Sequence, residues 1–101
     1  MCVSSLLRAR YDIDNKFFHH NLHGIIIALD YVIRCVKIYT SSSERGDVDI
    51  NVSIVAKTIV LQISNILKVL ENGAPLVMLV DFKKRMHQLI HIIIILDYEN
   101  L

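Results

Sequence analysis

Residues that interrupt helices and strands are few in this chain, and their scarcity limits what it can fold into. One proline and three glycines occur in 101 residues. Only two stretches are rich in turn-forming residues, the polar run at 40–47 and Asn72-Gly73-Ala74-Pro75. They divide the chain into three apolar segments of about 20 residues or more. Strands usually extend over about five or six residues, so segments of this length favour helices.

Apolar residues recur at helical spacing in the second and third segments. Between residues 50 and 70, and again between 79 and 96, apolar side chains follow one another at steps of three and four. This pattern predicts amphipathic helices near 49–71 and 76–97. The alternative is β structure, because β-branched runs such as 25–27 and 92–95 would also suit buried strands.

Capping signals support the bounds of the helix predicted near 49–71. Asp47 or Asp49 precedes it and is a suitable N-cap, because a short carboxylate can accept hydrogen bonds from the free amides of the first turn. Gly73 follows its last apolar residue, and Pro75 comes two positions later. This order predicts a helix end with Gly73 in the left-handed conformation.

The first segment is the most apolar. Residues 25–39 are interrupted only by Asp30, Arg34 and Lys37, which share one narrow stripe. We expect a helix near 16–39, preceded by a break at 12–15 and a short helix over 3–12. A helix that is apolar around most of its circumference must be covered on several sides.

These elements predict a single domain over residues 1–101. Its fold class is all-α, an antiparallel three- to four-helix bundle that is completed by oligomerisation. The residues expected off the seam within one chain, and so in the binding interface, are Ile26, Ile33, Ile92 and Ile94. An apolar patch of that size exceeds what soluble monomers usually expose, so a protein partner or a second copy, as in a homodimer, is expected to cover it.

Composition narrows the classes of function. Eleven basic residues against ten acidic ones give a net charge of +1, which produces no broad attraction to nucleic acid or anionic membranes. The charges within 25–38 argue against a membrane span there. Two cysteines without disulfide or metal-site spacing suit a reducing compartment, so we expect a cytoplasmic protein. No cofactor motif occurs, and we expect no cofactor.

Five histidines are placed in pairs that could bind metal. His19 and His23 are four residues apart, as are His87 and His91, so each pair shares a helix face. Two such pairs on neighbouring helices would offer four imidazoles to a metal ion. The carboxylates that usually accompany such histidines are missing at helical spacing, so no metal site is predicted.

Lys83, Lys84 and Arg85 form the only run of basic residues. They are a candidate phosphate-binding site. No aromatic residue is interleaved with them to stack on bases. A solvated helix face is therefore the favoured interpretation of the run.

The segment Lys84-Arg85-Met86-His87-Gln88-Leu89-Ile90-His91, followed by Asp97-Tyr98-Glu99, resembles the ribonuclease motif of the HEPN superfamily. The resemblance covers the C-terminal half only. It implies a metal-independent ribonuclease formed across a dimer of small helical bundles, or a degenerate relative that binds RNA. In that family Arg85 would hold the scissile phosphate, and His91 would act as general acid or base.

Two functions therefore follow from the sequence. The favoured one is a small helical protein-protein interaction module, such as an adaptor, chaperone, immunity or regulatory protein, which acts through an apolar helix face. The alternative is the HEPN-like ribonuclease.

Overall fold

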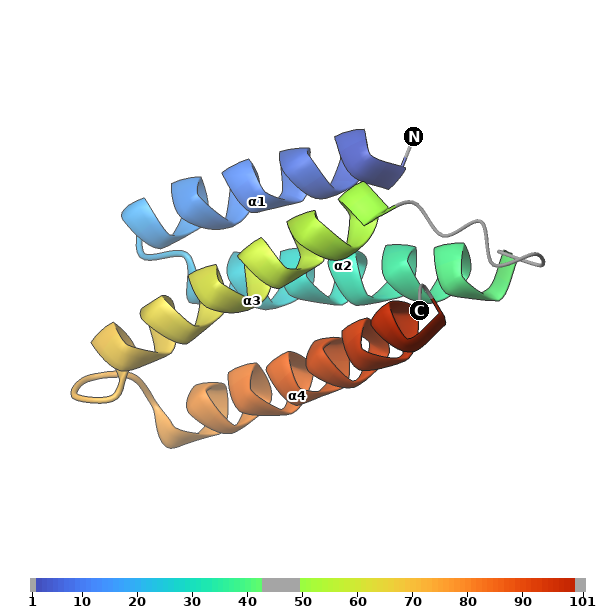
Figure 1. Cartoon of the computed structure of the whole chain (residues 1–101). Helices are drawn as coiled ribbons and strands as arrows, with labels where there is room; N and C mark the ends of the chain where they lie inside the picture. The colour runs from blue at the N-terminus through green and yellow to red at the C-terminus, as the bar shows by residue number, and fades with distance from the viewer. Residues whose placement is uncertain (1, 43–49, 100–101) are drawn as a thin grey trace.

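The computed structural model describes residues 2–42 and 50–99, and helices make up nearly all of them. The helices are α1 (Cys2–Phe18), α2 (Leu22–Ser42), α3 (Ile50–Leu70) and α4 (Leu76–Glu99) (Figure 1). No strand occurs in these two ranges. The predicted all-α class is confirmed, and the β alternative is wrong for the part of the chain that is described.

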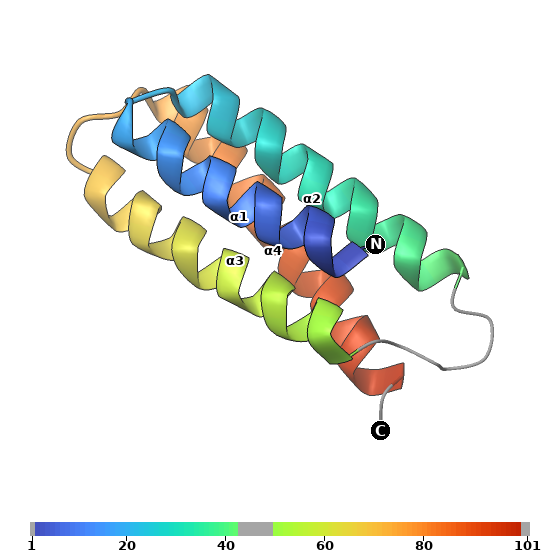
Figure 2. The same cartoon turned by 90° about the horizontal axis from the view of Figure 1, so that it is seen from above.

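The four helices form an elongated bundle of two hairpins. α1 packs against α2 and α3, and α4 packs against α3 and α2. α2 and α3 meet only slightly across one diagonal, and α1 and α4 are not in contact. The helices run antiparallel within each hairpin, whereas α1 runs parallel to α3 and α2 runs parallel to α4 (Figures 1 and 2). The antiparallel arrangement expected from the sequence therefore holds for helices that are consecutive in the chain, and the contacts of α1 with α3 and of α2 with α4 are parallel.

α1 is longer than expected, because the break predicted at 12–15 does not occur. The helix continues to Phe18. Leu6, Ala9 and Ile13 lie three and four positions apart and are all buried. Burial of Ile13 extends the helix through a stretch whose Asp and Asn residues suggest a turn.

The turn between α1 and α2 closes one helix and caps the next. His20 has a φ of 57°, which is left-handed backbone. Its N–H donates to the Phe17 carbonyl at 3.0 Å, and the Asn21 N–H donates to the Lys16 carbonyl at 2.7 Å, as in a Schellman motif. The Asn21 side-chain oxygen accepts from the Gly24 N–H at 3.0 Å and so caps α2.

The turn between α3 and α4 differs from the prediction at one glycine. α3 ends at Leu70, close to the predicted bound, and the Leu70 carbonyl accepts from the N–H groups of Gly73 and Ala74. Gly73 does not adopt a left-handed φ, so that part of the prediction is wrong. The Pro75 carbonyl accepts the first hydrogen bonds of α4. The proposed caps Asp47 and Asp49 lie outside the described residues.

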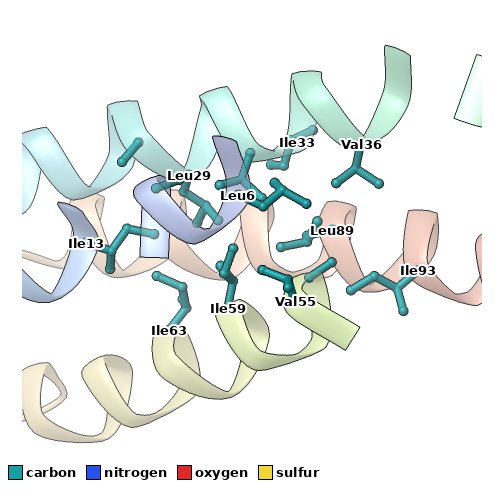
Figure 3. Packing of buried hydrophobic residues seen from close by; sticks show 14 of the residues in the cluster. Leu6, Ile13, Leu29, Ile33, Val36, Val55, Ile59, Ile63, Leu89 and Ile93 are labelled. Carbon is teal, nitrogen blue, oxygen red and sulfur yellow. The ribbon is translucent and has the colours of Figure 1, made fainter. Parts of the chain in front are cut away.

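Apolar side chains from all four helices form one core. Figure 3 shows these side chains converging between the helices. The members with no exposed surface include Ile13, Ile25, Leu29, Ile59, Ile63, Phe82, Leu89 and Leu96. The core therefore runs along the axis of the bundle, and each helix contributes one stripe to it.

A polar contact ties the start of α3 to the end of α4. The buried hydroxyl of Ser53 donates to the Asp97 carboxylate at 2.6 Å, and the Lys57 ammonium lies 2.8 Å from the other carboxylate oxygen. The hydrogen bond from Lys57, and then that from Ser53, lower the pKa of Asp97. The carboxylate therefore holds the two helices together in its charged form.

Within residues 2–42 and 50–99, α3 is the one helix that is apolar enough, by length and composition alone, to cross a membrane. The stretch is Asn51–Leu70, and 44% of it is buried inside the bundle. The core helix of a soluble protein passes the same test. Residues 25–38, whose charges argue against a span, belong to α2, and the apolar length of α3 was not anticipated from the sequence.

Candidate functional site

Three of the four predicted interface residues belong to the chain's own core. Ile26, Ile33 and Ile92 are 7%, 5% and 8% exposed, and only Ile94 is open to solvent, at 61%. The prediction that all four lie off the intrachain seam is therefore wrong for the first three. The reason is the contact between α2 and α4, which covers the side of each helix that carries these residues.

Arg85, the predicted phosphate ligand, is engaged in an ion pair. Its guanidinium donates two hydrogen bonds to the Asp30 carboxylate, at 2.9 and 3.1 Å, and lies 3.6 Å from Asp81. The hydrogen bond to Asp30 is the main cause that raises the pKa of Arg85. Asp30 is on α2 and Arg85 is on α4, so the pair ties two parallel helices together.

Arg85 and His91 lie on different faces of α4. Six residues of an α-helix turn through about 600°, which leaves the two side chains roughly 120° apart and about 9 Å apart along the axis. Arg85 is directed to α2, whereas His91 is exposed. One copy of the chain does not bring the two proposed catalytic groups together.

The basic run is divided in the same way. Lys83 and Lys84 are exposed, and neither forms an ion pair with another described residue. Arg85 is half-buried against Asp30. The three candidate phosphate ligands therefore do not point to one place.

The histidine pairs do not assemble into a metal site. Within 2–42 and 50–99, no three His, Cys, Asp or Glu side chains lie close enough to hold a metal ion. His19 and His23 are exposed near the turn between α1 and α2, and His87 and His91 are exposed on α4. The four-imidazole arrangement considered from the sequence is therefore wrong for this chain.

A groove that the sequence did not predict lies between α1 and α2. Its volume is about 710 Å³, within the usual range of protein binding sites. The α2 wall is made of Gly24, Ile27, Ala28 and Tyr31. Ile27 and Tyr31 are 57% and 47% exposed, so the apolar part of this wall faces solvent.

Small residues explain why the groove exists. Ser5 and Ala9 on α1, and Gly24 and Ala28 on α2, are each four residues apart and therefore share a helix face. Without long side chains between the helices, the space above their contact stays open. A Cβ at Gly24 would lie 2.8 Å from the Lys16 side chain, so the groove is narrow at that end. The paired small residues are the signal that could have predicted it.

The α1 wall of the groove is polar and carries alternating charges. Arg8, Asp12 and Lys16 follow one another at steps of four residues, next to Ser4 and Ser5. None of the three charged groups forms an ion pair with another described residue. The groove therefore combines an apolar wall with charges that are free to bind another molecule.

Exposed apolar side chains extend from the groove along α2. Ile38 continues the line of Ile27 and Tyr31 at a step of seven residues. We call the groove with Ile27, Tyr31 and Ile38 the α1/α2 face. It contains the candidate binding site.

Comparison with known proteins adds no family to these observations. No protein-family model, curated protein or solved structure matches the chain.

Proposed function

We propose that this chain is a protein-interaction module that binds another polypeptide through the α1/α2 face. One observation carries the proposal. The bundle has a complete core of its own, and yet large apolar side chains stay exposed beside a groove whose charges have no partner. Ile27, Tyr31 and Ile38, at steps of four and seven on α2, are 57%, 47% and 62% exposed.

The chemistry of this face suits a polypeptide better than a small substrate. Aromatic and β-branched side chains next to a polar wall resemble the apolar centre and charged rim of a protein interface. Tyrosine is among the residues that contribute most to such interfaces. The groove offers no histidine, thiol or paired carboxylates for acid-base or nucleophilic chemistry.

Photo-crosslinking from the face tests the proposal. A photoreactive phenylalanine analogue replaces Tyr31 in the full chain, which is expressed in its own cells. The matched control carries the analogue in place of Lys68, which is exposed on α3. We expect polypeptide adducts from position 31 and few from position 68. Equal yields from both positions, or none from either, would contradict the proposal.

The HEPN-like ribonuclease is a separate hypothesis with a separate assay. It requires Arg85 to leave Asp30 and to act with a histidine from another copy. Metal-free RNA cleavage that is lost in both Arg85→Ala and His91→Ala would support it. Absence of cleavage across RNA substrates would exclude the ribonuclease hypothesis and would not bear on the proposed interaction module.

A further inference from the structure

We infer that the partner which binds the α1/α2 face is a second copy of this chain, with Arg8 of each copy paired to Asp12 of the other. The inference rests on the proposed function and names its partner. The two opposite charges are one helical turn apart and have no partner among the described residues. A surface with this pattern is complementary to itself under a two-fold rotation.

The extent of the groove fixes where the axis lies. Its α1 wall runs from Ser4 to Lys16, so its centre falls midway between Arg8 and Asp12. A two-fold axis through that centre, in the plane of the interface and perpendicular to the helices, lays α1 antiparallel on α1 of the second copy. Arg8 then faces Asp12 twice, once on each side of the axis. The same axis gives the two grooves their largest overlap.

The α2 wall fits the same axis. This wall runs from Gly24 to Tyr31, and its centre lies between Ile27 and Ala28. The rotation therefore brings the Ile27 side chains of the two copies close together. It also places Tyr31 of each copy at the level of Gly24 of the other, where the side chains of Lys16 and Asn21 lie over the glycine. Contact of the ring with the Lys16 side chain adds apolar area to the charge pairing.

The surface required is available on one side of the bundle. A dimer of standard size buries about 800 Å² per partner, which is roughly one eighth of the 6481 Å² of accessible surface. The α1/α2 face is one of the four sides of the bundle. Its exposed apolar residues can therefore be covered without rearrangement of the core.

The outer face of α4 also exposes apolar side chains, and it does not fit a second copy. Val80 and Ile94 are exposed on it, but Lys84, His87 and His91 lie between them on the same side of the helix. No acidic residue occurs between positions 82 and 96. A two-fold axis through the middle of this face would set Lys84 of each copy against His91 of the other, with no acidic group to pair with the lysine.

Charge reversal tests the pairing, with mass measured by light scattering and affinity by sedimentation at micromolar concentrations. Wild type is expected to have twice the one-chain mass of 11.6 kDa. Arg8→Asp and Asp12→Arg should each weaken the dimer roughly 100-fold, because each creates two like-charge contacts. An equimolar mixture of the two variants should form a heterodimer, and the double variant should return to the affinity of wild type.

Matched controls make the same charge changes elsewhere. Lys68→Asp and Glu71→Arg alter exposed residues near the end of α3 and should leave the dimer affinity unchanged. Circular dichroism checks the helix content of every variant. If a charge-reversed variant fails to fold, Arg8→Gln and Asp12→Asn replace it, and each should weaken the dimer by a smaller factor.

Two outcomes would overturn the inference. One is a wild-type chain that stays monomeric at every concentration, and the other is a dimer that Arg8→Asp weakens no more than Lys68→Asp does. Neither touches the proposed function, which photo-crosslinking from position 31 to a different polypeptide would still support.

Discussion

Helix α2 has a neighbour on each side, and the two contacts are built differently. On the α4 side, Ile26 and Ile33 are buried, and Asp30 forms a bidentate pair with Arg85. On the α1 side, Gly24 and Ala28 stand next to a groove. The first contact is complete within one chain, whereas the second leaves apolar surface and unpaired charge exposed.

The difference shows which apolar residues serve the fold and which are free for a partner. Ile27 and Ile33 belong to the same largely apolar helix, and hydrophobicity alone does not distinguish one from the other. What distinguishes them is the side of α2 on which they fall. Ile33 lies on the side covered by α4, whereas Ile27 lies in the groove above the small residues through which α2 contacts α1.

The largest expected effect comes from truncating one isoleucine on each side. Ile33→Ala should lower the free energy of unfolding by about 2–4 kcal/mol, because it leaves a cavity in the core. Ile27→Ala should change that of the monomer by less than about 0.5 kcal/mol and should weaken the dimer instead. Urea unfolding at concentrations below the dimer dissociation constant measures the first effect, and sedimentation measures the second. Equal losses of stability would show that the two sides are not different.

Removing one cation from each side is expected to have a smaller effect. Arg85→Met breaks the pair with Asp30 and should cost about 1 kcal/mol, since the Asp30 side chain is 44% exposed and solvent screens the pair. Arg8→Met should leave the stability of the monomer unchanged. Urea unfolding at low and high salt measures both, and only the effect at Arg85 should shrink with salt. A salt-independent loss at Arg85 would mean that packing, not charge, links α2 to α4.

The turns that connect the helices of the two hairpins should be stabilised by opposite substitutions. His20 has left-handed backbone, so His20→Gly should stabilise the chain by about 0.5–1 kcal/mol. Gly73 does not have such backbone and has open space around it, so Gly73→Ala should stabilise by about 0.4–1 kcal/mol. Thermal unfolding followed by circular dichroism measures both changes. A loss at either position would place the left-handed residue elsewhere.

The smallest effect concerns pH and the tie between α3 and α4. Because the pKa of Asp97 is lower in the folded chain, its pair with Lys57 and Ser53 adds stability above the unfolded pKa of about 3.9. That contribution is lost as the pH falls through the lower folded value. Asp97→Asn should therefore be less stable than wild type at neutral pH, and the gap should close in acid. Urea midpoints across this range test it, and a constant gap would contradict it.

Periodicity predicted the helices well, because it records which side of each helix is buried. The bounds near 49–71 and 76–97 agree with α3 and α4 to within a few residues. The failure at 12–15 arose from local propensity, since Asp and Asn favour turns and only the packing of Ile13 keeps α1 helical there.

The candidate site was harder to predict, because it depends on which helices are neighbours. Gly24 and Ala28 mark a groove only if Ser5 and Ala9 lie opposite them. Likewise, the sequence places Asp30 and Arg85 far apart, and only the parallel contact of α2 with α4 brings them together. Ile26 and Ile92 were assigned to an interface because this contact could not be anticipated.

The closest packing in this molecule is between helices that are consecutive in the chain, α1 with α2 and α3 with α4. Each hairpin can therefore form as soon as its own residues have been synthesised, before the other hairpin exists. Most of the early contacts span short loops, which is the topology of rapidly folding domains. Until the second hairpin arrives, however, the first exposes the side that will bury Ile26 and Ile33, and a nascent chain is most vulnerable to aggregation at that stage.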